Sequence, residues 1–304
     1  MNLVLTAPVF LDEVTFEQIF LQWGRNYNGK IDTLIVDMED IEFIDPYGMV
    51  GIIEFGCFLK TIEIDPLLNL PKSEAVLKYL ERMDFLRFAL STYRVPGSCP
   101  ALTETYLRSK GSDVLLEITK IENSDDIHYI VGKVKSRAKS ILEAHLHYDK
   151  KTTHGFIVAL SEICQNILEH SENTGFVGIQ KYFYQRRLGK NVVKIAVMDL
   201  GIGIKNSLEN KLSPLFGDKW SDIFAIEQAL IHGTSRHSEA GRGHGLSAVR
   251  RFVTQWSGKV SIRSGTAKLA IIPPWDRDRS RRPTLPFFPG TQLSLVLPEI
   301  SPWP

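Results

Sequence analysis

Glu162 and Asn166 lie four residues apart, about one turn of a helix, and together could bind a cation and activate a water. An Asn oxygen can ligate Mg²⁺ without adding charge, and a partly buried Glu can take a proton from a nucleophile. The surrounding apolar residues recur at helical spacing, at Phe156, Leu160, Ile163 and Ile167. Because an ordinary amphipathic helix with a solvated polar face shows the same pattern, the pair alone leaves both interpretations open.

A second segment with chemical potential begins at Asp199, directly after a run of β-branched residues from Val192 to Met198. That run is typical of a buried strand. Gly201 and Gly203 follow at i+2 and i+4, and they allow the backbone to turn tightly and to approach a ligand. A strand that ends in an Asp-Gly turn is also common without any ligand.

A third segment is a glycine-rich run that leads into a predicted helix at residues 246–253. Free N–H groups and the positive end of a helix dipole make such a run suitable for binding phosphates. It is not a Walker loop, because no Gly-Lys-Ser/Thr follows, and its spacing differs from a dinucleotide fingerprint. The run consists of Gly241, Arg242, Gly243, His244, Gly245 and Leu246.

In this order and spacing, the three segments resemble the N box and the two glycine boxes of the GHKL ATPases. This group includes sensor histidine kinases, gyrase-type topoisomerases, heat-shock chaperones and the serine kinases that control sigma factors. The resemblance implies ATP and Mg²⁺ as cofactors, with Glu162 as the catalytic base and Asn166 as the metal ligand. It implies that Asp199 accepts a hydrogen bond from the adenine amino group, that Gly201 and Gly203 make room for the base, and that residues 241–246 hold the phosphates.

The resemblance spans about residues 113–298 and implies a Bergerat-type α/β sandwich, in which a mixed sheet is covered by helices. Gly290-Thr291 opens an alternating strand that resembles the family's late strand, where Thr291 would reach the adenine edge. Residues 258–264 are the expected hairpin partner of this strand. Residues 205–240 would form a lid over the phosphates, with a short helix at 223–230. The long excursion at 265–289 contains a mixed charge run that is more typical of a solvated surface than of a site.

Residues 1–95 are expected to form a separate α/β domain. A strand is predicted at residues 32–38, and a helix is predicted to begin at Asp45-Pro46, with Asp as N-cap and Pro in the first turn. Over about 30 residues this region resembles a STAS domain, the partner fold of the anti-sigma kinases. Asp45-Pro46-Tyr47-Gly48 lacks the phosphorylatable serines of that family. A docking or dimerising role is therefore expected here. Residues 96–112 read as a linker, and 113–304 as the ATP-binding domain.

Composition constrains the function class. A chain of 304 residues is long for one core, and 43% hydrophobic residues with a net charge of +1 describe a soluble globular protein. This charge gives no drive toward nucleic acid or a membrane. Neither a long apolar run nor a signal-peptide pattern occurs, so a cytoplasmic location is expected. The three cysteines are widely separated and imply neither a disulfide framework nor a zinc knuckle.

Two functions from different classes remain open. The first is a Mg-dependent regulatory switch that binds ATP and hydrolyses it or transfers its phosphate, and that is most similar to anti-sigma kinases. The second is an ATP-gated protein-interaction module with little or no turnover. Both imply a protein partner, STAS-like or another regulator, and both allow a homodimer. The presence of both Glu162 and Asn166 favours the first, because a pure binding module has less need of a base.

Overall fold

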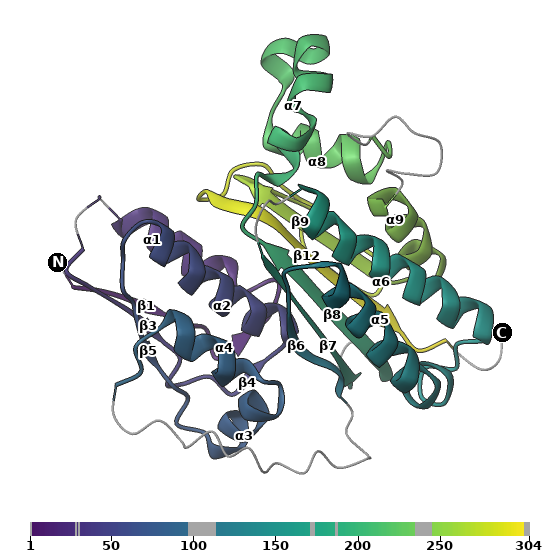
Figure 1. The fold of residues 1–304 in the computed structure, drawn as a ribbon, viewed down its shortest axis with the longest axis horizontal. Helices are drawn as coiled ribbons and strands as arrows, with labels where there is room; N and C mark the ends of the chain where they lie inside the picture. Colours follow the sequence, from purple (N-terminus) through teal and green to yellow (C-terminus); the bar gives the residue numbers. More distant parts are fainter. Residues whose placement is uncertain are drawn as a thin grey trace. The chain divides into compact units, whose positions relative to one another are not determined.

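The computed structural model describes residues 2–27, 29, 31–96, 114–170, 174–185, 188–234 and 245–300. The chain divides into two compact units, Met1–Ser112 and Asp113–Pro304 (Figure 1). Apart from Pro96, the expected linker at 96–112 lies outside the described residues. None of the helices in the described ranges combines the length and the hydropathy that a bilayer-spanning helix requires.

The first unit contains a parallel sheet with the strand order β1-β3-β5 and a short parallel pair, β2-β4. The strands are β1 (Asn2–Thr6), β2 (Phe10–Leu11), β3 (Thr33–Asp37), β4 (Phe43–Ile44) and β5 (Leu67–Asn69). The helices are α1 (Glu17–Asn26), α2 (Pro46–Thr61), α3 (Glu74–Arg82) and α4 (Phe85–Thr92). This unit is α/β, as expected. Its resemblance to a STAS domain stays a prediction.

Helix α2 begins where the sequence predicts. The Asp45 side chain accepts a hydrogen bond from the Gly48 backbone N–H at 2.9 Å, and Pro46 occupies the first turn. These two residues satisfy the requirements of a helix N-terminus, where an acceptor is needed and a missing N–H costs nothing. A Cβ at Gly48 would lie 2.7 Å from the Leu11 carbonyl oxygen, so the helix packs directly on β2.

The second unit is built on one sheet, which in the described residues has seven strands in the order β11-β10-β9-β12-β8-β7-β6. The strands are β6 (Val114–Ile121), β7 (Gly175–Tyr184), β8 (Lys190–Asp199), β9 (Lys259–Gly265), β10 (Ala267–Ile271), β11 (Arg281–Arg282) and β12 (Phe288–Pro298). The helices are α5 (Ser124–Ala138), α6 (Lys150–His170), α7 (Gly203–Phe216), α8 (Asp222–Leu230) and α9 (Gly245–Gln255), with a π-helical turn at Lys139–Glu143 and a 3₁₀ turn at Gly217–Lys219.

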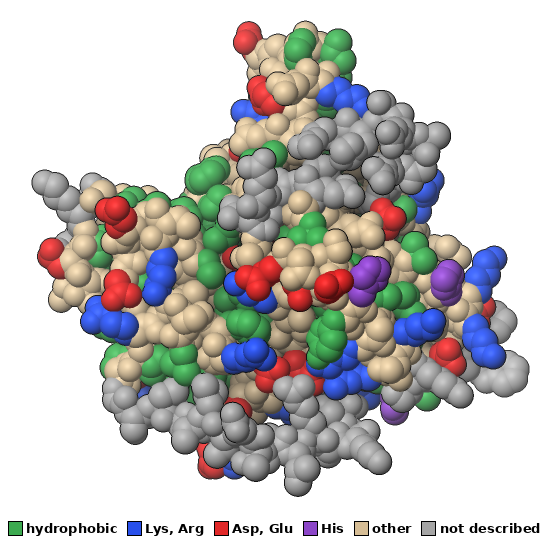
Figure 2. All heavy atoms as spheres, viewed as in Figure 1, with side chains coloured by type: hydrophobic (Ala, Val, Ile, Leu, Met, Phe, Trp, Pro, Cys, Tyr) green, Lys and Arg blue, Asp and Glu red, His purple; other side chains and the backbone are tan. Residues whose placement is uncertain are grey.

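Strand alternation gives this sheet one apolar face. Ile195 and Val197 of β8, with Leu293 and Leu295 of β12, belong to one buried core together with residues of α5 to α9. Helices α5, α6 and α9 pack side by side over this face (Figure 1). On the side of the molecule that Figure 2 shows, acidic and basic side chains are interspersed, in keeping with the net charge of +1. The predicted α/β sandwich, a sheet covered by helices, is confirmed.

The direction of the strands corrects one part of that prediction. A mixed sheet was expected, but every pairing between neighbouring described strands of the second unit is antiparallel. The connection from β6 to β7 contains two helices, α5 and α6, so the chain reverses direction three times and β7 runs antiparallel to β6. The pairs β7-β8 and β9-β10 are hairpins, and β12 inserts antiparallel between β8 and β9, which confirms the predicted pairing of 258–264 with 290–298.

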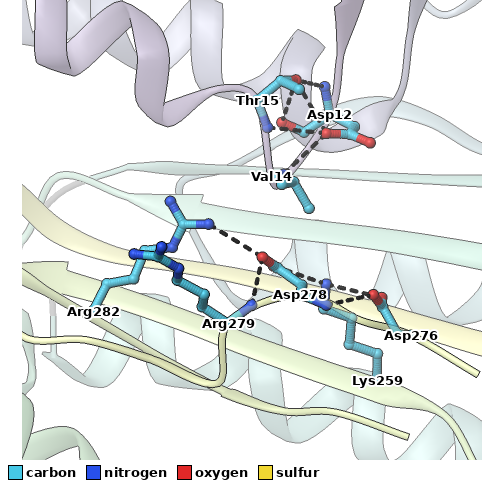
Figure 3. Close-up of polar contacts among 8 residues, drawn as sticks. All are labelled: Asp12, Val14, Thr15, Lys259, Asp276, Asp278, Arg279 and Arg282. Carbon is cyan, nitrogen blue, oxygen red and sulfur yellow. Dashed lines mark hydrogen bonds and ion pairs between the residues drawn. The ribbon is translucent and has the colours of Figure 1, made fainter. Parts of the chain in front are cut away.

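The charge run in the 265–289 excursion is a second correction, because part of it is buried. Lys259 Nζ lies 3.1 Å from Asp276 Oδ2 and 3.3 Å from Asp278 Oδ2, and Asp278 also pairs with Arg282 at 3.1 Å (Figure 3). The side chains of Lys259, Asp276 and Asp278 are only 3%, 5% and 7% exposed. Buried charges require partners, and these residues provide them for each other. The excursion is therefore an ordered part of the second unit.

We expect Lys259→Met to lower the free energy of unfolding by about 3 kcal/mol or more, because it leaves two buried carboxylates without their shared cation. Urea denaturation of the full chain would measure the loss. The matched control is Lys120→Met, which removes a lysine whose ion pair with Glu122 is 38% and 53% exposed. That change should cost less than about 1 kcal/mol. Equal losses in the two variants would contradict a stabilising role of the buried network.

Candidate functional site

Asp199 is the last residue of β8 and lies in a row of aligned residues that crosses β7, β8, β12 and β9. Its partners in register are Gly175 and Thr291, and Thr291 is in turn paired with Ser264. Residues aligned across neighbouring strands point to the same face of a sheet. The next row on this face is apolar and buried, and consists of Val177, Val197, Leu293 and Ile262. We call Asp199, Thr291 and Ser264 the polar row, because they replace apolar residues where the helix-covered face ends.

The Asp199 carboxylate is buried, with 8% of the residue exposed. Its Oδ1 accepts a hydrogen bond from the Gly201 backbone N–H at 2.7 Å. Burial raises the pKa of Asp199 to about 7, and the backbone N–H groups of Gly201 and Thr291 act in the opposite direction. A carboxylate in such a place costs free energy when it is ionised. A ligand that donates a hydrogen bond to it would offset part of that cost.

Two glycines give the backbone around Asp199 its shape. Gly203 opens α7 with φ of +75°. Gly290, with φ of +74°, lies where the pairing of β12 with β9 shifts register between Phe288 and Thr291. A Cβ at Gly290 would lie 2.0 Å from the Asp199 carbonyl oxygen, which no side chain could tolerate. This close approach of two backbones sets Thr291 beside Asp199.

Helix α6 carries Glu162 and Asn166, and both residues are half-buried. The predicted apolar stripe of this helix is confirmed, since Phe156, Leu160, Ile163 and Ile167 are at most 4% exposed. A Cβ at Gly175, the register partner of Asp199, would lie 2.9 Å from Ile167 Cδ1. The end of α6 that bears Asn166 therefore packs at the same end of the sheet as Asp199.

Glu162 and Asn166 place side-chain oxygens, the ligand type that Mg²⁺ takes, one turn apart on α6. Within the described residues, Glu162 and Asn166 make no hydrogen bond or ion pair with another described residue, and no group of three or more His, Cys, Asp or Glu side chains could hold a metal. Mg²⁺ is usually bound by one or two protein oxygens together with phosphates and waters. Asn166 could supply one such oxygen.

Most of the predicted phosphate loop, from Gly241 to His244, lies outside the described residues. The predicted helix after it is confirmed: Gly245 begins α9, and Leu246 packs against the core of the second unit. A Cβ at Gly233 would lie 2.9 Å from Ser247 Oγ. The chain thus leaves α8 beside the first turn of α9, so both ends of the segment 234–245 lie next to this turn.

The expected lid, 205–240, contains ordered helices in its described part, and α8 confirms the predicted helix at 223–230. The first residue of α8, Asp222, accepts hydrogen bonds from the Thr266 backbone N–H at 2.8 Å and the Thr266 hydroxyl at 2.6 Å. Glu227 of α8 pairs with Arg281 at 3.3 Å. These contacts attach α8 to the edge of the sheet formed by β10 and β11.

Sequence reasoning did not single out Ser264, although it belongs to the polar row. A signal for it does exist. In β9 the apolar face carries Val260 and Ile262, and alternation would place a third apolar residue at position 264. A serine at that position breaks the pattern.

The raised pKa of Asp199 predicts how Asp199→Asn changes stability with pH. The folded protein binds a proton at Asp199 up to about pH 7, whereas an unfolded Asp releases it near pH 4, so the contribution of this group to stability falls as pH rises through that window. We therefore expect the unfolding free energy of Asp199→Asn, relative to the parent, to rise by roughly 3 kcal/mol from about pH 5 to about pH 8.

Denaturant unfolding of both proteins at the two pH values measures this difference. The exposed Asp218 provides the control, because Asp218→Asn at the surface should change the unfolding free energy by less than about 0.5 kcal/mol at either pH. If the unfolding free energies of Asp199→Asn and the parent differ by the same amount at both pH values, burial does not destabilise the ionised Asp199 carboxylate.

Comparison with known proteins agrees with this geometry. Residues 153–299 match the family model of the histidine kinase-, DNA gyrase B- and HSP90-like ATPases. The matched range runs from α6 to β12 and contains every candidate residue described above. A search of curated proteins found no match for this chain. The match and the helix-covered sheet together support a GHKL-type ATPase domain in residues 153–299.

Proposed function

We propose that the second unit is a Mg-dependent ATP switch that hydrolyses ATP or transfers its terminal phosphate to a protein. The single observation that supports this most strongly is the buried Asp199 carboxylate at the end of the apolar face, aligned with Thr291. A buried acceptor beside a hydroxyl matches the hydrogen-bonding edge of adenine, which presents an amino donor next to a ring acceptor. Gly201 and Gly203 would leave room for the base above the turn.

The proposed phosphate side consists of residues 241–246 and the first turn of α9. The N-terminal N–H groups of a helix and its positive dipole end favour an anion, and Arg242 would add a positive charge. Asn166 would provide an oxygen to Mg²⁺, which neutralises the phosphates when bound. The hydrogen bond from Thr266 to Asp222 would hold α8, the helix that precedes the phosphate loop, against the sheet.

In this proposal Glu162 acts as the general base. It precedes Asn166 by one turn of α6, so it would lie beside the metal-bound phosphates and could take a proton from a water or from the hydroxyl of a protein substrate. Two protein partners fit the proposal: a STAS-like or other regulator, as for anti-sigma kinases, and a second copy of this chain. We place this activity in the cytoplasm.

The alternative, an ATP-gated interaction module, differs in the fate of the phosphate. Incubation of the full chain with γ-labelled ATP and Mg²⁺, with and without a STAS-domain protein, separates the two. Free labelled phosphate would support an ATPase, and label on protein would support a kinase. ATP that stays bound and intact would favour the interaction module.

We expect Glu162→Gln to keep ATP affinity within about threefold and to lower turnover by roughly 100-fold, the usual effect of losing a general base. Calorimetry measures the affinity, and phosphate release or protein labelling measures the turnover. Gln165→Ala is the matched control, because Gln165 is an exposed polar residue of the same helix, and it should change neither quantity. Undiminished turnover in Glu162→Gln would remove Glu162 from the mechanism.

A further inference from the structure

One hydroxyl of the polar row connects three elements of the second unit. Ser264 Oγ, on β9, accepts a hydrogen bond from the Ile204 backbone N–H at 3.0 Å and donates one to the Gly290 carbonyl oxygen at 2.8 Å. Ile204 belongs to the first turn of α7, and Gly290 belongs to β12. Ser264 itself is 3% exposed. Its hydroxyl therefore uses both its acceptor and its donor on backbone groups, away from water.

Each backbone partner involves a glycine that shapes the site, because Ile204 follows Gly203 and the accepting carbonyl is that of Gly290 itself. Gly203 lies close to both atoms of the second hydrogen bond. A Cβ at Gly203 would lie 2.9 Å from Ser264 Oγ and 3.2 Å from the Gly290 carbonyl oxygen. Gly290 approaches the Asp199 backbone more closely still. The hydroxyl thus ties together the two left-handed turns on either side of Asp199.

The Ile204 N–H is one of the N-terminal helix donors that have no partner within the helix. In the described residues no side chain of α7 caps this helix end, and Ser264 supplies the acceptor from the sheet. Removing the hydroxyl would leave a buried N–H and a buried C=O without this partner, which is unfavourable in a protein interior. The first turn of α7 could lower that cost by moving away from the sheet, and Gly203 would move with it.

We infer that Ser264 is a positioning residue that holds the adenine side of the site in its binding geometry. The inference rests on the proposed function. Ser264 would act through the backbone of Gly203 and Gly290, without contact to the phosphates. It follows that the first turn of α7 stays attached to the sheet, and that any movement of the proposed lid begins after that turn.

The test compares Ser264→Ala, Ser264→Cys and Ser264→Thr with the parent chain by calorimetric titration with adenosine, ADP and ATP in Mg²⁺. Alanine removes the hydroxyl, cysteine fills its space with a weak hydrogen-bonding group, and threonine keeps it. The control is Ser261→Ala, because Ser261 is on the same strand, is 1% exposed, and its Oγ has no hydrogen-bond partner among the described residues. Thermal unfolding of each variant checks that it is folded at the titration temperature.

We expect the alanine and cysteine variants to bind all three ligands about tenfold more weakly, by a similar factor for each, because the adenine side is shared. Threonine should restore the affinity to within about threefold, and Ser261→Ala should bind as the parent does. A merely structural role of Ser264 would lower the unfolding temperature without changing the affinity of the folded protein.

Three results would overturn the inference: unchanged affinity in Ser264→Ala, a loss confined to ATP, or an equal loss in the threonine variant. Each leaves the proposed function intact as long as the parent chain binds the three ligands. Failure of the parent chain to bind any of them would overturn the proposed function itself, and the inference with it.

Discussion

The burial of one carboxylate, that of Asp199, is the constraint on which the rest of the site depends. Ionised, it is unfavourable in the free protein, and burial raises its pKa to about 7. Nothing in the packing of the sheet requires an acid there, because the rows below it are filled with valine, leucine and isoleucine. A residue that costs stability at the end of an otherwise apolar face is a common sign of a binding site. A ligand that donates a hydrogen bond to the carboxylate would offset the cost.

Several backbone features follow from keeping that carboxylate in one place. Thr291 can lie beside it only because β12 shifts register before it and Gly290 has no Cβ. The turn after Asp199 returns the Gly201 N–H to its side chain, and Gly203 starts α7 in a left-handed conformation. The packing of Ile167 against Gly175 brings the Asn166 end of α6 to the same end of the sheet. Residues far apart in the sequence thereby contribute to one region of the second unit.

Much of this arrangement could be predicted from the sequence, because it depends on local patterns. The apolar stripe of α6, the β-branched run of β8 and the Asp-Pro start of α2 each gave the correct element. The predicted strand direction was wrong, because the direction of a strand depends on how many helices lie between it and the strand before it. The burial of Asp276 and Asp278 depends on Lys259, seventeen and nineteen residues earlier in the chain, and no local pattern reveals such a pairing. Ser264 breaks the alternation of β9, but that local signal does not reveal its role, because its partners lie 26 and 60 residues away.

The central claim is that Asp199 recognises a hydrogen-bond donor on the base, and exchanging donor and acceptor on both sides tests it most directly. Inosine triphosphate carries a carbonyl oxygen where ATP carries the amino group. At about pH 8, where the Asp199 carboxylate is ionised, the parent offers only an acceptor, and Asp199→Asn offers an amide donor in its place. Calorimetry with both nucleotides on both proteins would give the four affinities. The parent should prefer ATP by about tenfold or more, and the variant should lose or reverse that preference. The same ratio of ATP to inosine triphosphate affinity in both proteins would contradict recognition of the base by Asp199.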